Sequence, residues 1–359
     1  MHVSALNMGR IDIHGEPRLR TWTKLNETAY AGTNYFITSD PVDWRSGDKL
    51  VITGTVQSVS GDGYHSEGYQ LEEITVDYLG EDQHHVYLTQ NFVFTHWSEF
   101  PVVEGRPIDL RCAVGLLNRN IKIQGDDRSD GQQYGVHTFT MGSEYRIENA
   151  EITRCGQSYN TGRYCTHSHH SGNLEGSYVK ANSIHHSYQR AVTTHDTQHW
   201  EVRDNVAFDI TGHAYFIEDG TELYNSLSGN LGIWIKPSSA LLKSDQEPAV
   251  FWTANPTNFW SDNYAAHSFK FGYWFQLDGA STVTVGTTNV CPMYSPLGEF
   301  FNNTARGVMD VGFRIYPQWS PLVDPCDGNS RTAPQYLYNT VSFHNGRGSF
   351  NGFTVLILQ

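Results

Sequence analysis

The sequence predicts an all-β chain in which a smaller β region precedes a right-handed parallel β-helix, a solenoid of stacked coils. Three observations predict this fold: short runs of alternating apolar and polar residues, an asparagine that recurs along the second part, and almost no helical spacing. The composition agrees with it. The chain has 359 residues, 13% aromatic side chains and 33 glycines but only 17% charged residues, which excludes a coiled coil and a disordered chain.

Residues 1–110 alternate apolar and polar side chains between turn signals. Examples are the runs DWRSGDKLVITGTVQSV, QLEEITVDYLG and HHVYLTQNFVF, in which Gly and Asp punctuate short apolar segments. A period of two is typical of strands with one buried face. We therefore expect a β region of short strands over residues 1–110, followed by the β-helix over residues 111–359.

An asparagine followed by alternating small or apolar residues recurs from about residue 145 onward. These asparagines are Asn149, Asn182, Asn205, Asn230, Asn263, Asn303 and Asn339, and by subtraction they lie 33, 23, 25, 33, 40 and 36 residues apart. A unit of 23 to 25 residues holds three short strands and their turns, which is one coil of a β-helix. Asparagine suits a corner between strands, because it tolerates left-handed backbone angles and its amide can hydrogen-bond to the next coil.

Charge and hydropathy restrict the partners of the chain. The formal net charge is 24 minus 38, or -14, which repels nucleic acid from most of the surface. No run of about 18 apolar residues is present, so we expect no direct membrane insertion by this segment. The oligomeric state is left open.

The ends of the chain and its cysteines bear on its location. Residues 1–15 lack the basic start and apolar run of a signal peptide, and both ends look like strands cut from a longer polypeptide. Asn26 and Asn302 begin glycosylation sequons. Five cysteines allow at most two disulfides within the chain, and buried free thiols are the alternative. We expect a segment of a secreted or membrane-anchored protein, glycosylated at Asn26 or Asn302 in a host that glycosylates.

Histidines are concentrated between residues 167 and 213. His167 and His169 lie two apart, so in a strand both leave from one face. The next two units supply His185, His186, Arg190 and His195, and then His213, Glu218 and Asp219. Because neighbouring coils stack about 4.8 Å apart, equivalent points of three coils form one patch. The sequence therefore predicts a patch of imidazoles with one arginine and two carboxylates.

Three interpretations of this patch stay open on the residues alone. Imidazoles and carboxylates can hold a divalent metal ion, for which His167, His169 and His213 are the candidate ligands. They can instead form an acid and base pair, or a structural ladder of satisfied polar groups. Aromatic residues along the repeats suit the stacking of sugar rings, but most of them are expected to fill the core.

Several segments resemble one family of extracellular β-helix proteins. They include TWTKLN, DWRSGDKLVITGT, VGLLNRNIKIQG, SIHHSYQRAVTTH, VRDNVAFDITGHAYFIEDG and PLGEFFNNTARG, in the family's order and over nearly the whole chain. The family contains fibrocystin, fibrocystin-L, the cell migration-inducing hyaluronan-binding protein and its transmembrane hyaluronidase relative. The resemblance implies that residues 1–110 are the end of the domain named for its eight glycines with its connection. It also implies an extracellular or cell-surface location.

The resemblance also extends to the candidate site. His167 and His169 match a Tyr-Pro-Ile/Val-His-Phe-His strand of the hyaluronidase-associated members, although Cys165, Thr166, Ser168 and His170 depart from it. The resemblance implies binding, and in some members depolymerisation, of an acidic glycan of the hyaluronan type by a hyaluronidase-type glycosidase. On this basis the candidate catalytic residues are His167, His169, His195, His213, Glu218 and Asp219, and the candidate substrate-binding residues are Arg190, His185 and His186. A divalent metal ion is the one cofactor considered. The alternative is a non-catalytic, fibrocystin-like structural or adhesion stalk.

Overall fold

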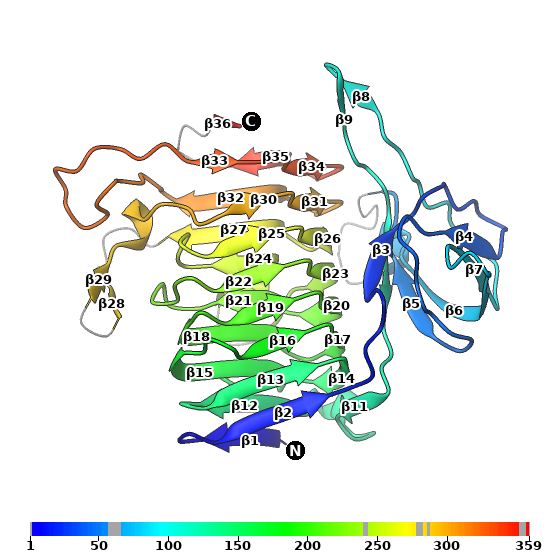
Figure 1. The fold of residues 1–359 in the computed structure, drawn as a ribbon, viewed down its shortest axis with the longest axis horizontal. Coiled ribbons are helices and arrows are strands. Elements are labelled where there is room, and N and C mark those ends of the chain that lie inside the picture. The colour runs from blue at the N-terminus through cyan, green and yellow to red at the C-terminus, as the bar shows by residue number, and fades with distance from the viewer. Residues whose placement is uncertain are drawn as a thin grey trace.

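The computed structural model describes residues 2–56, 66–239, 243–277, 283–285, 288–351 and 357–358. Within these residues Figure 1 shows a tall stack of parallel strands with an antiparallel unit on one flank. Consecutive strands visit three sheets in turn and then return to the first, as β12 (His137–Met141), β13 (Glu144–Glu148), β14 (Ala150–Cys155) and β15 (Thr166–Asn173) do. The all-β fold and the parallel β-helix predicted from the repeat are confirmed.

Three parallel sheets form the walls of the β-helix in the described residues. The first, here called the site sheet, contains β1 (His2–Leu6), β12, β15, β18 (Val192–Gln198), β21 (Tyr215–Ile217), β24 (Ala249–Thr253), β27 (Phe271–Leu277), β32 (Val311–Pro317) and β35 (Gly348–Asn351). The second contains β2 (Arg10–His14), β13, β16 (Tyr178–Lys180), β19 (Glu201–Arg203), β22 (Ser226–Ser228), β25 (Phe259–Ser261) and β30 (Phe300–Phe301). The third contains β11 (Ile121–Gln124), β14, β17 (Ser183–Ser187), β20 (Val206–Thr211), β23 (Leu231–Lys236), β26 (Tyr264–Ser268), β31 (Thr304–Arg306) and β34 (Val341–Phe343).

The antiparallel unit is inserted into the first coil of the β-helix, between β2 and β11. Its sheet runs in the order β3 (Trp22–Lys24), β10 (Ala113–Leu116), β5 (Lys49–Ile52), β6 (Glu72–Leu79), β7 (His85–Leu88) and β4 (Tyr35–Ile37). The strand pairs connect residues on both sides of the boundary expected at residue 110. β1 and β2 pair with β12 and β13 of the β-helix, whereas β10 pairs with β3 and β5. Alternation alone does not reveal which sheet a strand joins, and the division into folding domains stays a prediction.

The remaining described elements are short. Two-stranded pairs are formed by β8 (Val102–Val103) with β9 (Arg106–Pro107), β28 (Val283–Val285) with β29 (Thr288–Val290), and β33 (Tyr336–Leu337) with β36 (Ile357–Leu358). The helical turns are η1 (Ser66–Tyr69), α1 (Ser129–Gln132), η2 (Lys243–Gln246) and η3 (Pro292–Tyr294). In the described part of the chain, no helix has the length and apolar character needed to cross a lipid bilayer.

Aromatic side chains fill the interior of the β-helix and stack from coil to coil. Tyr215, Phe251, Tyr273 and Phe313 lie ring on ring, with centroid separations of 4.8, 4.8 and 4.7 Å. This is the spacing of hydrogen-bonded strands, so each ring covers the ring of the coil before it. Most of the aromatic residues considered for sugar stacking are thus core residues, as the sequence led us to expect.

A ladder of buried asparagines runs along one corner of the β-helix. Its members are Asn182, Asn205, Asn230, Asn263 and Asn303, all at most 1% exposed. Each side-chain oxygen accepts a backbone N–H from the preceding coil, for example from Asn205 to Asn230 at 3.1 Å. Each side-chain nitrogen donates to a carbonyl of the preceding coil, as Asn230 does to Val202 at 2.8 Å. The predicted corner role is confirmed for these five residues.

The other two recurring asparagines, Asn149 and Asn339, lie one position earlier in the corner. Their φ angles are +52° and +46°, in the left-handed region. Other coils place Ala181, Asp204 and Asp262 at this position, with φ of +55°, +55° and +58°. One residue of each corner therefore adopts the left-handed backbone angle, and the next residue supplies the amide of the ladder. The spacing of the asparagines alone does not distinguish these two positions.

Four of the five cysteines are paired. Cys155 is bonded to Cys165, and Cys291 to Cys326, whereas Cys112 is a buried free thiol. The first disulfide joins the end of β14 to the residue just before β15. It therefore fixes the entry into the strand that carries His167 and His169.

Candidate functional site

The histidine-rich segments lie on the outer face of the site sheet. Side chains alternate along its strands, so that Val192 and Tyr215 belong to the core while Phe216 belongs to a separate cluster on the opposite face. The register places His169 beside His195 in the neighbouring coil. The strands β15, β18 and β21 thus bring residues far apart in sequence to one surface.

Three imidazoles meet on this face. One ring nitrogen from each of His167, His169 and His195 lies within 4.8 Å of the other two. The closest contact joins Nδ1 of His169 to Nδ1 of His195 at 2.8 Å. Both residues directly precede a left-handed residue, His170 and Asp196, and the register between β15 and β18 shifts there. We call His167, His169 and His195 the histidine cluster.

His167 is the buried member of the cluster. It is 1% exposed, and burial lowers its pKa well below the ordinary value, so the ring is neutral. Its Nδ1 donates to the carbonyl oxygen of Gly162 at 2.9 Å, and this bond leaves Nε2 unprotonated. That Nε2 is buried and has no hydrogen-bond partner among the described residues. Burial and the neighbouring His195 also lower the pKa of His169, to about 4.

Two carboxyl groups adjoin the cluster in contrasting environments. Asp219 accepts a hydrogen bond from Nε2 of His195 at 2.7 Å, which lowers the pKa of this carboxyl group. The Glu218 side chain is only 18% exposed, and burial raises its pKa. Its Oε2 lies 3.7 Å from Nδ1 of His195 and has no hydrogen-bond partner within the described chain. Glu218 and Asp219 are adjacent in sequence, but their surroundings favour the protonated form of Glu218 and the ionised form of Asp219.

Arg190 and His213 are buried and adjoin the same carboxylate, Asp245. Arg190 is fully buried, with its guanidinium 2.6 Å from a carboxylate oxygen of Asp245 and 3.5 Å from the ring centroid of Phe216. His213 Nε2 lies 3.7 Å from Asp245, and burial lowers the pKa of His213 to about 3. Arg190 reaches Glu218 only at 4.0 Å. Arg190 and His213 are therefore buried around Asp245, and the group of three imidazoles contains His195.

His185 and His186 lie on a different wall. Both belong to β17 of the third sheet, and their Nδ1 atoms lie 2.7 Å apart. Their carboxylate neighbours are Glu151, 3.3 Å from His185, and Glu73, 3.8 Å from His186. The two histidines therefore do not adjoin the cluster on the site sheet.

Two acidic residues that lie near the histidine cluster were not identified from the sequence. Glu222 is fully buried, and its oxygens accept backbone N–H groups of Asp196, Asp219 and Gly220 at 2.7, 3.1 and 2.8 Å. Burial raises the pKa of Glu222 to about 7. The second is Asp245, which comes from η2, outside the recurring units. Neither residue belongs to a repeated position, so no pattern indicated it.

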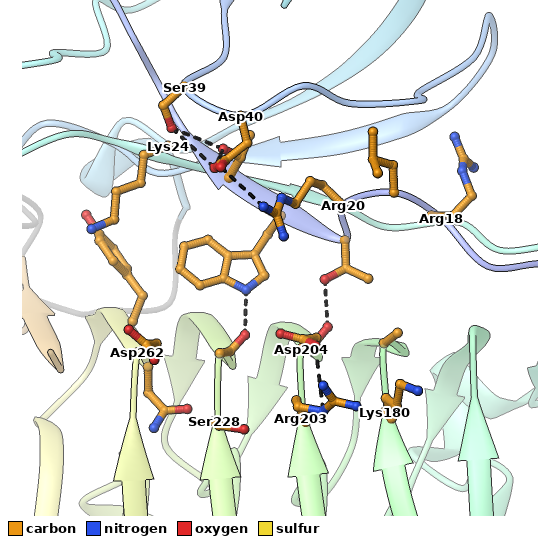
Figure 2. Close-up of a pocket in the computed structure, with 18 of the residues that line it drawn as sticks. Arg18, Arg20, Lys24, Ser39, Asp40, Lys180, Arg203, Asp204, Ser228 and Asp262 are labelled. Atoms are coloured by element: carbon orange, nitrogen blue, oxygen red, sulfur yellow. Dashed lines mark hydrogen bonds and ion pairs between the residues drawn. The ribbon is translucent and has the colours of Figure 1, made fainter. Parts of the chain in front are cut away.

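A second candidate site is a cleft of about 830 Å³ between the antiparallel unit and a corner of the β-helix. Figure 2 shows Lys24 and Asp40 of the antiparallel unit facing Asp204 and Asp262 at the ends of the β-helix strands. Across the cleft, the Trp22 indole donates to the carbonyl oxygen of Gly229 at 2.6 Å. This bond joins the two units.

The basic residues that line the cleft are already paired with carboxylates. Each of its basic residues lies within 4.0 Å of a carboxylate in the described chain: Arg18, Arg20, Lys24, Arg111, Lys180 and Arg203. A polyanion would have to compete with these carboxylates for every cation. The cleft therefore suits a neutral polar ligand better than an acidic glycan.

Comparison with known proteins places the chain in a family. The model of the CEMIP beta-helix matches residues 133–313, which contain the histidine cluster and both adjoining carboxylates. The chain belongs to the CEMIP beta-helix family. Fibrocystin-L of Mus musculus is 33% identical over 88% of this chain, and fibrocystin-L of Homo sapiens is 32% identical over 95%. The human cell surface hyaluronidase CEMIP2 is 29% identical over 79% of the chain.

The chain spans only a small part of these relatives. It covers 8% and 9% of the two fibrocystin-L sequences and 23% of the cell surface hyaluronidase CEMIP2. Among solved structures, the catalytic domain of a GH87 alpha-1,3-glucanase in complex with nigerose matches 95% of this chain and 89% of its own length. The TM-score is 0.28 and the identity 9%, which adds nothing to the fold established by the strand pairing.

Proposed function

We propose that the chain binds an acidic glycan of the hyaluronan type on the outer face of the site sheet and cleaves it as a glycosidase. The observation that carries the proposal is the pair Glu218 and Asp219, two adjoining carboxyl groups in opposite environments beside three imidazoles. Glycosidases commonly use one protonated and one ionised carboxyl group at the scissile bond. Membership of a family that includes cell surface hyaluronidases supports the choice of glycan.

Each group has a distinct role in this proposal. Glu218, whose burial favours the protonated form, donates a proton to the glycosidic oxygen as the bond breaks. Asp219, which is ionised and has a 54% exposed side chain, is the candidate base. His195 joins the two carboxyl groups, and Arg190 and His213 hold the wall beneath them through Asp245. Arg190 thus acts as a positioning residue.

Electrostatics set a further requirement. The net charge of -14 opposes the approach of a polyanion, and the buried guanidinium of Arg190 is committed to Asp245. Because the pKa values of His167 and His169 are lowered, local compensation has to come from a protonated His195 or from a bound cation. We also place the chain outside the cell, with Asn26 and Asn302, both in exposed positions, as glycosylation sites.

The test uses purified chain and size-defined hyaluronan, with product length measured by gel electrophoresis. We expect cleavage by the wild-type chain and a loss of about 10²–10⁴-fold in Glu218→Gln, the usual contribution of a general acid. The matched control is Glu175→Gln, an exposed carboxyl group on the turn after β15. Equal activity of Glu218→Gln and Glu175→Gln would remove Glu218 from the chemistry.

A structural or adhesion stalk is the second candidate function. It is favoured by the complete burial of Arg190, Asp245 and His213. In a stalk, Arg190 and His213, which match the family's motifs, would stabilise the β-helix and would not contact a ligand. The relatedness to fibrocystin-L is consistent with it. A folded wild-type chain that neither binds nor shortens hyaluronan would favour the stalk, and binding without cleavage would leave a lectin-like module.

A further inference from the structure

The histidine cluster has the donor arrangement of a metal site. Nε2 of His167 is buried and has no partner among the described residues, and His167, His169 and His195 each offer one ring nitrogen within 4.8 Å of the others. In a tetrahedral zinc site, bonds of about 2.0–2.1 Å put ligand nitrogens roughly 3.3 Å apart. Nδ1 of His169 and Nδ1 of His195, which are 2.8 Å apart, therefore need to separate by about 0.5 Å, and no pair among the three nitrogens needs to close by more than about 1.5 Å.

The groups around the cluster fix its tautomers in the required way. Asp219 accepts the N–H of His195 Nε2, and the carbonyl of Gly162 accepts the N–H of His167 Nδ1. Both bonds leave the opposite ring nitrogen free to bind a cation, and metal-binding histidines usually have such a carboxylate or carbonyl partner. The contact of 2.8 Å between Nδ1 of His169 and Nδ1 of His195 then requires a proton on His169. A metal ion would displace that proton.

We propose that His167 Nε2, His169 Nδ1 and His195 Nδ1 bind one zinc ion, with Asp219 and Gly162 as the groups that orient the ligands. Three imidazoles favour zinc over calcium or magnesium, which bind oxygen ligands. Glu218 Oε2, 3.7 Å from His195 Nδ1, borders the fourth position. The ion would place positive charge where a polyanion needs it. The site stands on its own geometry and does not depend on the proposed cleavage of hyaluronan.

Zinc affinity tests the proposal directly. Wild-type chain is titrated with zinc ion against a chromophoric chelator, and thermal unfolding is followed with and without the ion. We expect one zinc ion per chain and a higher unfolding temperature when zinc is bound. His169→Ala should weaken binding at least ~100-fold, and Asp219→Asn should weaken it about 10–100-fold.

The chain offers a matched control in His186→Ala. His185 and His186 also have two Nδ1 atoms in contact, at 2.7 Å, but they lie on another sheet and outside the three-histidine group. Zinc affinity should be unchanged in His186→Ala, and its unfolding temperature should still rise with zinc. Cobalt ion replacing zinc should give visible absorption bands of a four-coordinate site in the wild type and the control but not in His169→Ala.

Several results would overturn the proposal. They are equal zinc affinity in His169→Ala and the wild type, an equal loss of affinity in His186→Ala, or displacement of zinc by an equal concentration of calcium. The hyaluronan assay is read separately. Zinc binding with no cleavage leaves the metal site standing and contradicts the glycosidase, whereas cleavage by a chain that binds no zinc contradicts the metal site alone.

Discussion

Replacing Arg190 with methionine removes the counter-charge of a buried carboxylate. Arg190 and Asp245 are both fully buried, and the guanidinium contacts the carboxylate through Nε at 3.0 Å and Nη2 at 2.6 Å. Removing one partner of such a pair costs about 3–5 kcal/mol, because the remaining charge has no water to solvate it. His213 also adjoins Asp245, but burial lowers its pKa to about 3, so with Arg190 in place the imidazole is neutral. We expect Arg190→Met to lower the free energy of unfolding by about 3–5 kcal/mol.

The assay is chemical denaturation followed by tryptophan fluorescence, with the slope of the transition checked for constancy. Arg163→Met is the control, because Arg163 is exposed and lies three residues before β15. The double variant Arg190→Met, Asp245→Leu should recover most of the loss, since it leaves no unpaired charge. If Arg190→Met lowered the free energy of unfolding no more than Arg163→Met does, Arg190 would not support the wall.

Three further predictions concern the solenoid. Asn230→Ala leaves two buried backbone groups without partners and should cost about 2–6 kcal/mol of unfolding free energy, against less than about 0.5 kcal/mol for the exposed Asn160→Ala. Burial lowers the pKa of His267 well below 6.5 in the native chain. Below pH 6.5 this histidine is therefore protonated in the unfolded chain but not in the native chain, and the free energy of unfolding falls as the pH drops. His267→Phe should reduce that slope by up to about 1.4 kcal/mol per pH unit, and an unchanged slope would contradict the assignment. Replacing Cys155 and Cys165 by serine should cost about 3 kcal/mol in the same denaturation assay, and no loss would show that the bond does not constrain the chain.

Much of the fold was predictable because a solenoid repeats its sequence signals. Five recurring asparagines fall on one ladder, and the intervals of 23 and 25 residues between Asn182, Asn205 and Asn230 are bare coils. The inserted position of the antiparallel unit was not predictable in the same way. It depends on the pairing of β1 with β12, more than 130 residues apart, and strand alternation is the same in a parallel and an antiparallel sheet.

The candidate site was predictable as a region but not in its members. The sequence places His167, His169 and His195 in adjacent coils, and stacking brings them together. The sequence does not show which of the three sheets carries a given histidine. His185 was therefore grouped with the cluster, although its strand β17 belongs to the third sheet. Asp245 could not be found by pattern, because it reaches Arg190 from a helical turn 55 residues later in the chain.

The insertion within the first coil has a consequence for synthesis on the ribosome. β1 and β2 leave the ribosome more than a hundred residues before their partners β12 and β13. These two strands must therefore wait for their partners, while the antiparallel unit between the two pairs is already complete. A hydrogen bond of 2.7 Å from the Glu16 backbone N–H to the Asn120 side chain brings the two ends of that unit together. Because its ends meet, a change in the length of the unit would not by itself alter the register of the coils around it.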